Sequence, residues 1–349
     1  MSRIKDIRFR EIARPLRATF STAAGSKHLT KSIIVTVTLR DGVKVMGECP
    51  ASLAFKDESP PVMAGVLKEA APALLDMPID HYEEEIDRLR RVYALFPMTM
   101  SGLEVALFRA FLASKGMTEH AYWGGMTRTV PTDITIPFVP DRTFLVRWMN
   151  YAIRKGFTVY KLKVSGDPEQ DRELVSFVCS FLRDNLNNHT LRLDGNQGYN
   201  RDTFLRFVDH INKADYRIEL FEQPLPREDY KGMKDIRHAS PIPIILDETV
   251  LTGEDAQRVV DEDLADGVNI KLAKSGIRES CAILDIAQRH RLSLMIGCMT
   301  ETMVGLSAGI YLAGGTSVFD FIDLDSIYFF YHRNRYGMIQ IQGPRFTVE

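Results

Sequence analysis

The sequence predicts a parallel α/β barrel that follows a smaller α+β unit. Two observations carry this prediction. Before about residue 125 the strand-like segments come first and the helical segments after them, whereas from residue 130 onward the two kinds alternate. In the alternating part, ionisable residues recur at the ends of the strand-like segments. The chain has 349 residues, which is enough for a barrel core with an appended domain.

The N-terminal unit is expected to be an α+β domain. Residues 32–39, SIIVTVTL, are β-branched and partly alternating, and Asp41-Gly42 is a turn signal before a second strand. Helical periodicity then appears three times between residues 60 and 125, with Gly and Pro at the breaks. These features place the first domain at residues 1–125.

Eight strand candidates follow, with helical segments between most of them. They are residues 132–138, 158–164, 190–194, 217–221, 242–246, 267–271, 292–296 and 318–322. This alternation favours a (β/α) barrel, and an open doubly wound sheet is the alternative. Neither GxGxxG nor GKS follows an early strand, which argues against nucleotide binding.

Composition excludes several function classes. The formal net charge is −2, so there is no bulk attraction to nucleic acid or to an anionic membrane. No apolar run reaches the roughly 18–20 residues of a membrane span, and the charged start lacks a secretory signal pattern. The four cysteines show no CxxC or zinc-like spacing, which suits reduced thiols. We expect a cytoplasmic homo-oligomer that acts on a small molecule.

Three carboxylates end successive predicted strands. Asp194, Glu222 and Asp247 close the runs TLRLD, IELFE and IPIILD, 28 and 25 residues apart. A βαβ unit uses about that many residues, so the three side chains should meet at one end of the sheet. Oxygen ligands gathered in this way suit Mg²⁺ rather than Zn²⁺ or copper.

Lysines flank these carboxylates at other strand ends. Lys161 and Lys163 lie two residues apart and share one face of a strand, and Lys271 ends the run VNIK. Repulsion between the first two should lower the pKa of one of them, as a lysine base requires. Each motif alone has a structural alternative, such as solvated lysines, an Asx turn after Asp194 or a helix cap at Asp247. Their joint order on successive strands predicts metal-assisted proton transfer.

Asp323 and Asp325 form a further acidic pair. They share one face of the last predicted strand and its exit. The pair is suited to bind a cation, either a second metal ion or a substrate ammonium group.

The order of the motifs KxK, DxN, ExP, DE and IK resembles the enolase superfamily, in its muconate-lactonizing-enzyme-like subgroup. The resemblance covers nearly the whole chain. It implies a modified (β/α)7β TIM-like barrel at residues 126–326 under an α+β capping domain, 1–125, which the segment 327–349 completes. It also assigns the site: Asp194, Glu222 and Asp247 would hold one Mg²⁺ per subunit, Lys163 and Lys271 would be the acid/base pair, and Lys161 would bind the substrate carboxylate.

Two stretches narrow the resemblance to the dipeptide epimerases. They are IGCMTET at residues 296–302 and the Asp323/Asp325 pair, which in those enzymes receives the α-ammonium of the dipeptide. The cap segments 25–27 and 47–49 look closest to enzymes that epimerise L-Ala-D/L-Glu in murein peptide recycling, with Lys27 meeting the Glu side chain. Thr135, Asn196, Cys298 and Met299 are the remaining expected substrate contacts. The chain departs from the pattern at Ser326-Ile327, at Ser275-Gly276 and at its C-terminal GPRFTVE.

The implied reaction is a two-base 1,1-proton transfer through an enediolate, which inverts the α-carbon of the C-terminal residue. A divalent cation would stabilise the negative charge that forms when the α-proton leaves. The alternatives are a lyase or cycloisomerase of the same superfamily, such as o-succinylbenzoate synthase or muconate lactonizing enzyme, or an N-acylamino acid racemase. A non-catalytic Mg²⁺-binding scaffold is the third possibility.

Overall fold

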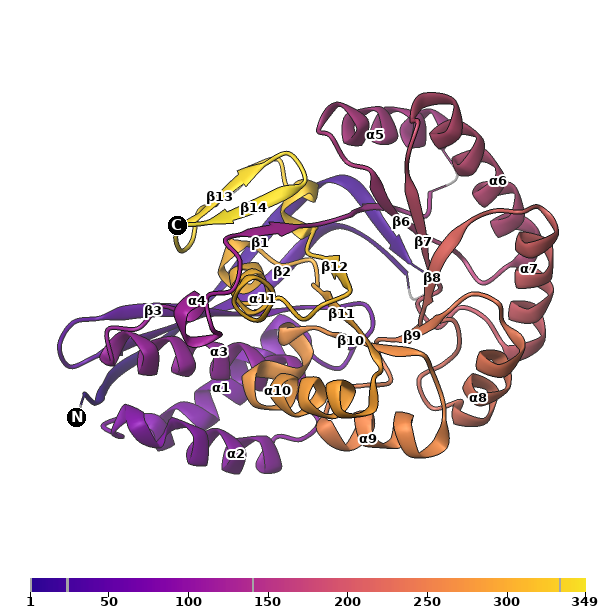
Figure 1. Cartoon of the computed structure of the whole chain (residues 1–349). Helices are drawn as coiled ribbons and strands as arrows, with labels where there is room; N and C mark the ends of the chain where they lie inside the picture. The colour runs from indigo at the N-terminus through magenta and orange to yellow at the C-terminus, as the bar shows by residue number, and fades with distance from the viewer. Residues whose placement is uncertain (1, 23–24, 140, 333) are drawn as a thin grey trace.

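The computed structural model describes residues 2–22, 25–139, 141–332 and 334–349. It consists of an antiparallel sheet with helices beside it, followed by a ring of strands with helices outside (Figure 1). The N-terminal strands are β1 (Ile4–Thr22), β2 (Gly25–Leu39) and β3 (Lys44–Pro50). The helices that follow are α1 (Pro60–Leu74), η1 (Ile79–His81), α2 (Tyr82–Val92), α3 (Pro97–Ser114) and α4 (Glu119–Tyr122).

The N-terminal sheet packs on α3 at very close range. β1, β2 and β3 pair antiparallel in chain order, as the strand and turn signals predict. A Cβ added to Gly47 would lie 2.1 Å from the carbonyl oxygen of Gly102, and one added to Gly102 would lie 2.4 Å from Cys49 Sγ. Glycine is therefore required on both sides of this contact, because any side chain would force the strand and the helix apart.

Eight parallel strands form the second sheet, and all eight predicted strands are confirmed. They are β5 (Ile134–Ile136), β6 (Val159–Lys163), β7 (Thr190–Asp194), β8 (Ile218–Glu222), β9 (Ile244–Leu246), β10 (Gly267–Ile270), β11 (Ser293–Gly297) and β12 (Phe321–Asp323). Neighbours in the sheet follow chain order from β5 to β12. The Asp133 N–H donates to Ile322 O at 3.3 Å, which joins the first and last strands. The open-sheet alternative is therefore wrong.

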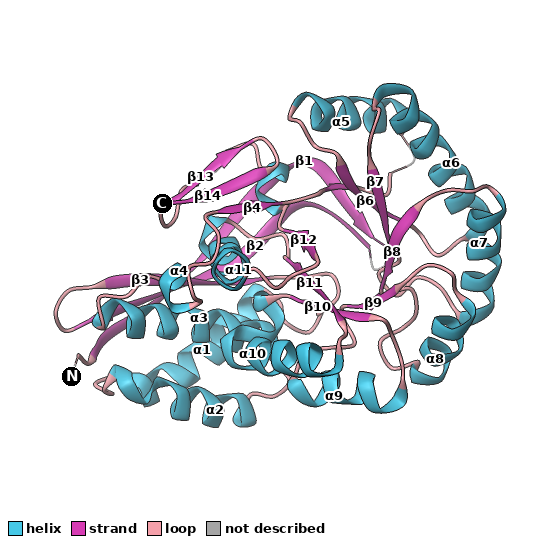
Figure 2. Ribbon diagram, in the orientation of Figure 1, coloured by secondary structure: helices cyan, strands magenta, loops and turns pink. Residues whose placement is uncertain are grey.

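Seven helices connect the eight strands and cover the outside of the barrel (Figure 2). They are α5 (Arg142–Arg154), α6 (Pro168–Asn185), α7 (Arg201–Lys213), α8 (Tyr230–Ala239), α9 (Gly253–Glu262), α10 (Leu272–His290) and α11 (Met303–Thr316). This is the expected (β/α)7β order. Thr252, not Asp247 or Glu248, forms the capping box of α9. The two acidic residues after β9 are thus not used as helix caps.

The C-terminal segment contacts both parts of the chain. After the short helix η2 (Ser326–Phe329), β13 (Ile339–Gln342) and β14 (Arg345–Val348) form a small sheet with β4 (Thr129–Pro131). Arg17 Nε of β1 donates to Phe330 O at 2.8 Å. That the segment 327–349 completes the cap, and that the domain boundaries lie at 125 and 326, stay predictions. Within the ranges that the structure describes, no helix is both long and apolar enough to span a membrane.

Candidate active site

The predicted acidic and basic residues meet at one end of the barrel. In the parallel register, Lys163 on β6 lies opposite Asp194 on β7, which lies opposite Glu222 on β8. Asp247 directly follows β9 and Lys271 directly follows β10. All five side chains are buried. The end of the barrel formed by the carboxyl termini of the strands therefore holds the five residues that the sequence placed there.

Lysine ammonium groups lie between neighbouring carboxylates. Lys161 Nζ is 3.0 Å from Glu222 Oε2 and 3.7 Å from Asp194 Oδ2. Lys271 Nζ is 2.6 Å from Asp247 Oδ2 and 3.5 Å from Glu222 Oε1. Lys163 Nζ donates to Asp194 Oδ2 at 2.6 Å and to Asn196 Oδ1 at 2.9 Å. A lysine ammonium group thus lies between Asp194 and Glu222, and another lies between Glu222 and Asp247.

The pKa values of these groups follow from their mutual contacts. Burial lowers the pKa of Lys161, but the carboxylates of Asp323 and Glu222 outweigh it and hold this pKa well above its usual value. The same balance, with Asp247 and Glu222 as partners, raises the pKa of Lys271. Burial raises the pKa of Glu222, yet the lysines lower it well below its usual range. A lowered pKa, predicted for one member of the Lys161/Lys163 pair, is therefore wrong for Lys161, because nearby carboxylates outnumber nearby cations.

Lys163 and Lys271 stand on opposite walls of the barrel. Their strands, β6 and β10, are four positions apart in an order of eight, with β7, β8 and β9 between them on one side. The three carboxylates occupy that intervening arc. A flat substrate group held by the arc would therefore have one lysine on each of its faces.

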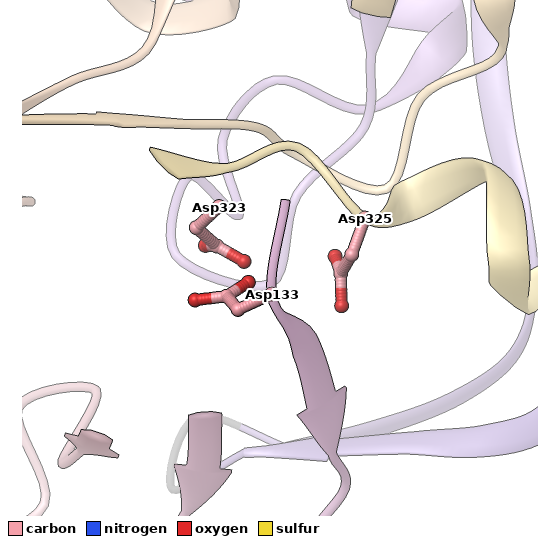
Figure 3. A group of neighbouring side chains, drawn as sticks. All are labelled: Asp133, Asp323 and Asp325. Carbon is pink, nitrogen blue, oxygen red and sulfur yellow. The ribbon is translucent and has the colours of Figure 1, made fainter. Parts of the chain in front are cut away.

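The carboxylates that lie closest together are not the predicted metal ligands. Among the described residues, Asp133, Asp323 and Asp325 have oxygen atoms within 4.8 Å of one another (Figure 3). The oxygen atoms of Asp194, Glu222 and Asp247 do not all lie this close together, and the ammonium groups of Lys161 and Lys271 lie between them. Their donor set still fits Mg²⁺: three buried carboxylates, each already in contact with a cation, supply the oxygen ligands that this ion prefers. The assignment of these three ligands stays a prediction.

One pocket collects every predicted substrate contact. Its wall includes Lys27, Thr135, Lys161, Lys163, Asn196, Asp247, Lys271, Cys298, Met299, Asp323 and Asp325. The cap contributes further residues that were not among the expected substrate contacts, namely Thr22, Ser52, Leu53 and Ala54. The loop after β3 thus reaches the barrel mouth together with the end of β1 and the start of β2.

Comparison with known proteins decides the family. Residues 145–348 match the family described as Enolase C-terminal domain-like. The chain belongs to the enolase-like family. The resemblance inferred from the motif order is therefore confirmed.

Among its relatives, this enolase-like protein is similar to an L-Ala-D/L-Glu epimerase of Thermotoga maritima, with 30% identity over 100% of the chain and 99% of the relative. A solved structure of the substrate-liganded L-Ala-D/L-Glu epimerase from Bacillus subtilis superposes with a TM-score of 0.92, at 27% identity over 99% of this chain and 96% of that one. A dipeptide epimerase from Enterococcus faecalis, complexed with Mg and L-Leu-L-Tyr, gives a TM-score of 0.90 at 25% identity, over 99% and 97% of the two chains.

Two buried residues that support the carboxylates were not singled out from the sequence. Lys274 lies in the first turn of α10, where its Nζ donates to the carbonyls of Asp247 and Val250 and lies 2.8 Å from Asp247 Oδ1. Asn269 Nδ2 donates to Glu222 Oε1 at 2.8 Å. The signal for Asn269 was present, because it lies two residues before Lys271 and therefore points to the same face of the strand.

Two further pocket residues have displaced pKa values. Burial and the nearby charge of Lys163 lower the pKa of Lys27 to about 8. Burial and the charge of Asp247 raise the pKa of Glu248 to about 8. Both groups line the pocket. The Lys27 side chain is thus a cation whose charge is lost in the mildly alkaline range.

Proposed function

We propose that the protein is a Mg²⁺-dependent dipeptide epimerase, an isomerase that inverts the α-carbon of the C-terminal residue. The observation that carries this proposal is the placement of Lys163 and Lys271 on opposite walls, with three carboxylates on the arc between them. An inversion by proton transfer needs one proton acceptor and one proton donor on opposite faces of the same carbon. This arrangement of side chains supplies both.

Each lysine is proposed to carry out one of the two proton transfers. Asp194, Glu222 and Asp247 would hold the magnesium ion, which would stabilise the negative charge that develops on the substrate carboxylate. For one epimer, Lys163 takes the α-proton and Lys271 returns a proton to the other face. For the other epimer the two roles are exchanged. Lys161, fixed by Glu222 at 3.0 Å, adds positive charge where the substrate carboxylate is expected.

Asp323 and Asp325 are proposed to bind the free ammonium group of the dipeptide. Both are buried at the pocket wall, and the Thr135 N–H fixes Asp325 Oδ2 at 2.6 Å. A lyase or cycloisomerase of the same family, or an N-acylamino acid racemase, would act on a substrate without this ammonium group. Two buried carboxylates facing such a substrate would be unfavourable, so the acidic pair favours a dipeptide.

The substrate side chain is proposed to be acidic, as in L-Ala-D/L-Glu. Lys27 lines the pocket from the cap and would place a cation near that side chain. The Thermotoga maritima relative, which matches the chain over its full length, is named for that activity. A role in murein peptide recycling in the cytoplasm follows as part of this proposal.

A dipeptide library incubated with the enzyme and Mg²⁺ in D₂O tests the proposal. Mass spectrometry should detect one deuterium on the α-carbon of the C-terminal residue, and chromatography should detect both epimers. Acidic C-terminal residues should react fastest. Chelation of Mg²⁺ should stop both signals. If no dipeptide takes up deuterium while N-acylated amino acids do, the protein is a racemase of the alternative class.

A further inference from the structure

Asp133 is a buried carboxyl group next to the pocket residues Asp323 and Asp325, and the proposed proton transfer does not use it. It directly precedes β5, is 1% exposed, and its Oδ2 accepts a hydrogen bond from Arg192 Nη1 at 2.8 Å. Its carboxyl group lies beside that of Asp323, with Asp325 across from both (Figure 3). The residue therefore contacts one half of the acidic pair proposed to bind the substrate ammonium.

Two oxygen atoms in this cluster lack a hydrogen-bond donor among the described residues. They are Asp133 Oδ1 and Asp323 Oδ1, both on buried side chains. A buried carboxylate oxygen without a donor is costly, so each case calls for a physical explanation. If one of these two carboxyl groups is protonated, its O–H can donate a hydrogen bond to the other. One proton then satisfies both oxygen atoms.

The balance of positive and negative side chains around the cluster also favours one protonated carboxyl group. Asp133, Asp323 and Asp325 face two cations, Lys161 and Arg192, and Arg192 Nε is already bound to Glu219 at 2.6 Å. Two adjacent buried carboxyl groups do not both ionise, because the repulsion between them is strong at low dielectric.

The neighbours of the pair decide which carboxyl group holds this proton. Lys161 donates directly to Asp323 Oδ2, whereas the cation beside Asp133, Arg192, is also paired with Glu219. The negative charge therefore belongs on Asp323. The pKa directions agree: burial and the charge of Asp323 raise the pKa of Asp133 well above its usual value. Burial alone would raise the pKa of Asp323, but Lys161 and the hydrogen bond with Asp133 lower it.

We propose that Asp133 is a positioning residue: as a neutral carboxylic acid it donates a hydrogen bond to the Asp323 carboxylate and fixes the orientation in which Asp323 receives the substrate ammonium. The ammonium part of this inference rests on the proposed function. The proton on Asp133 does not, because it follows from buried oxygens and charges of the protein itself.

Asparagine is the matched substitute for a neutral aspartic acid. In Asp133→Asn, the amide oxygen can accept from Arg192 and the amide nitrogen can donate to Asp323, so both contacts persist without a proton. In Asp133→Ala, Asp323 loses its donor and Arg192 loses an acceptor. We expect Asp133→Asn to keep kcat and KM within about threefold of the wild type, whereas Asp133→Ala raises KM for dipeptides about tenfold or more, the loss of one charge-assisted hydrogen bond.

Calorimetric titration of Mg²⁺ and infrared spectroscopy complete the test. Both variants should bind Mg²⁺ like the wild type. Above the usual titration range of aspartate, the wild-type spectrum should contain a protonated-carboxyl band that the Asp133→Asn spectrum lacks. Other protonated carboxyl groups, such as that of Glu248, contribute to both spectra and cancel in the difference.

Three results would overturn the inference. One is an Asp133→Asn variant as impaired as Asp133→Ala, which would make Asp133 an ionised partner of Arg192. Another is loss of Mg²⁺ binding in Asp133→Asn, which would make it a metal ligand. The third is the absence of any protonated-carboxyl band that distinguishes the wild type from Asp133→Asn. An enzyme inactive on all dipeptides that still shows the band would refute the proposed function alone.

Discussion

The two-base assignment predicts that each catalytic lysine serves one epimer. Lys163→Met and Lys271→Met keep most of the aliphatic stem and remove the ammonium group. Because β6 and β10 face each other across the barrel, each variant leaves one face of the α-carbon with its lysine. That face can still release and recover a proton. Interconversion of the epimers, which needs both faces, should fall by about 10³-fold, or about 4 kcal/mol of activation free energy.

The folded site should survive these substitutions. In Lys163→Met, Asp194 keeps Lys161 at 3.7 Å, and the Asn196 N–H still donates to Asp194 Oδ1 at 2.9 Å. Removal of a cation also makes the carboxylate arc more negative, so Mg²⁺ affinity should not decrease. Calorimetric Mg²⁺ titration checks this point. Lys213→Met is the matched control, because Lys213 is exposed on α7, where it pairs with Asp209 on the same helix.

Deuterium exchange resolves the two faces. Each epimer of an active dipeptide is incubated separately in D₂O with Mg²⁺, and both deuterium content and configuration are measured. Lys163→Met should exchange the α-proton of one epimer without inversion, and Lys271→Met should exchange only the other epimer. The reasoning is refuted if both variants exchange the same epimer, or if either variant interconverts the epimers at the rate of the Lys213→Met control.

Three further changes probe other parts of the site. Asp323→Asn should raise KM for free dipeptides by about 30-fold, as for the loss of about 2 kcal/mol in a buried charge pair, with Mg²⁺ affinity unchanged; equal turnover of N-acetylated dipeptides by the wild type would contradict the ammonium role. Because the pKa of Lys27 is about 8, the free enzyme loses this positive charge above pH 8, and KM for acidic dipeptides should then rise about tenfold per pH unit. KM for apolar dipeptides should not rise in this range, and neither should KM of the Lys27→Met variant for acidic dipeptides. Gly276→Ala should lower the free energy of unfolding by about 3 kcal/mol or more in denaturant titration, since φ is +70° at this kink within α10 and the new Cβ would lie 2.0 Å from Glu104 Oε2; a loss below about 1 kcal/mol would show that the backbone at the kink relaxes.

The barrel could be predicted because its signals are local. Each strand is a short β-rich run that can be recognised without knowledge of the other strands. The residue that ends it, such as Asp194 or Glu222, lies at the end of the barrel that forms the site. The motif order then identified the family. The exact distances could not be predicted, because they depend on how neighbouring lysines and carboxylates share the available charge.

The support beneath the site was not predictable for a different reason. Asp133 and Asp323 are 190 residues apart and meet only because the barrel closes, so no spacing in the sequence connects them. Lys274 gave a weaker signal, since a lysine in the first turn of a helix is ordinarily solvated. Its three acceptor atoms belong to the loop after β9. The fold places this loop next to Lys274, and no sequence pattern indicates that contact.

One contact between cap and barrel bears on how such proteins can recombine. The Glu48 carboxylate at the end of β3 accepts hydrogen bonds from the N–H groups of Thr302 and Gly305, at 3.0 and 3.1 Å, and so caps α11 from another domain. Arg109 of α3 donates to Val304 O at 2.7 Å in the same turn. A chimera that takes its cap from one relative and its barrel from another would inherit a helix whose first turn was fitted to a different partner. Exchange between relatives is therefore easier for the loops that touch the pocket than for whole domains.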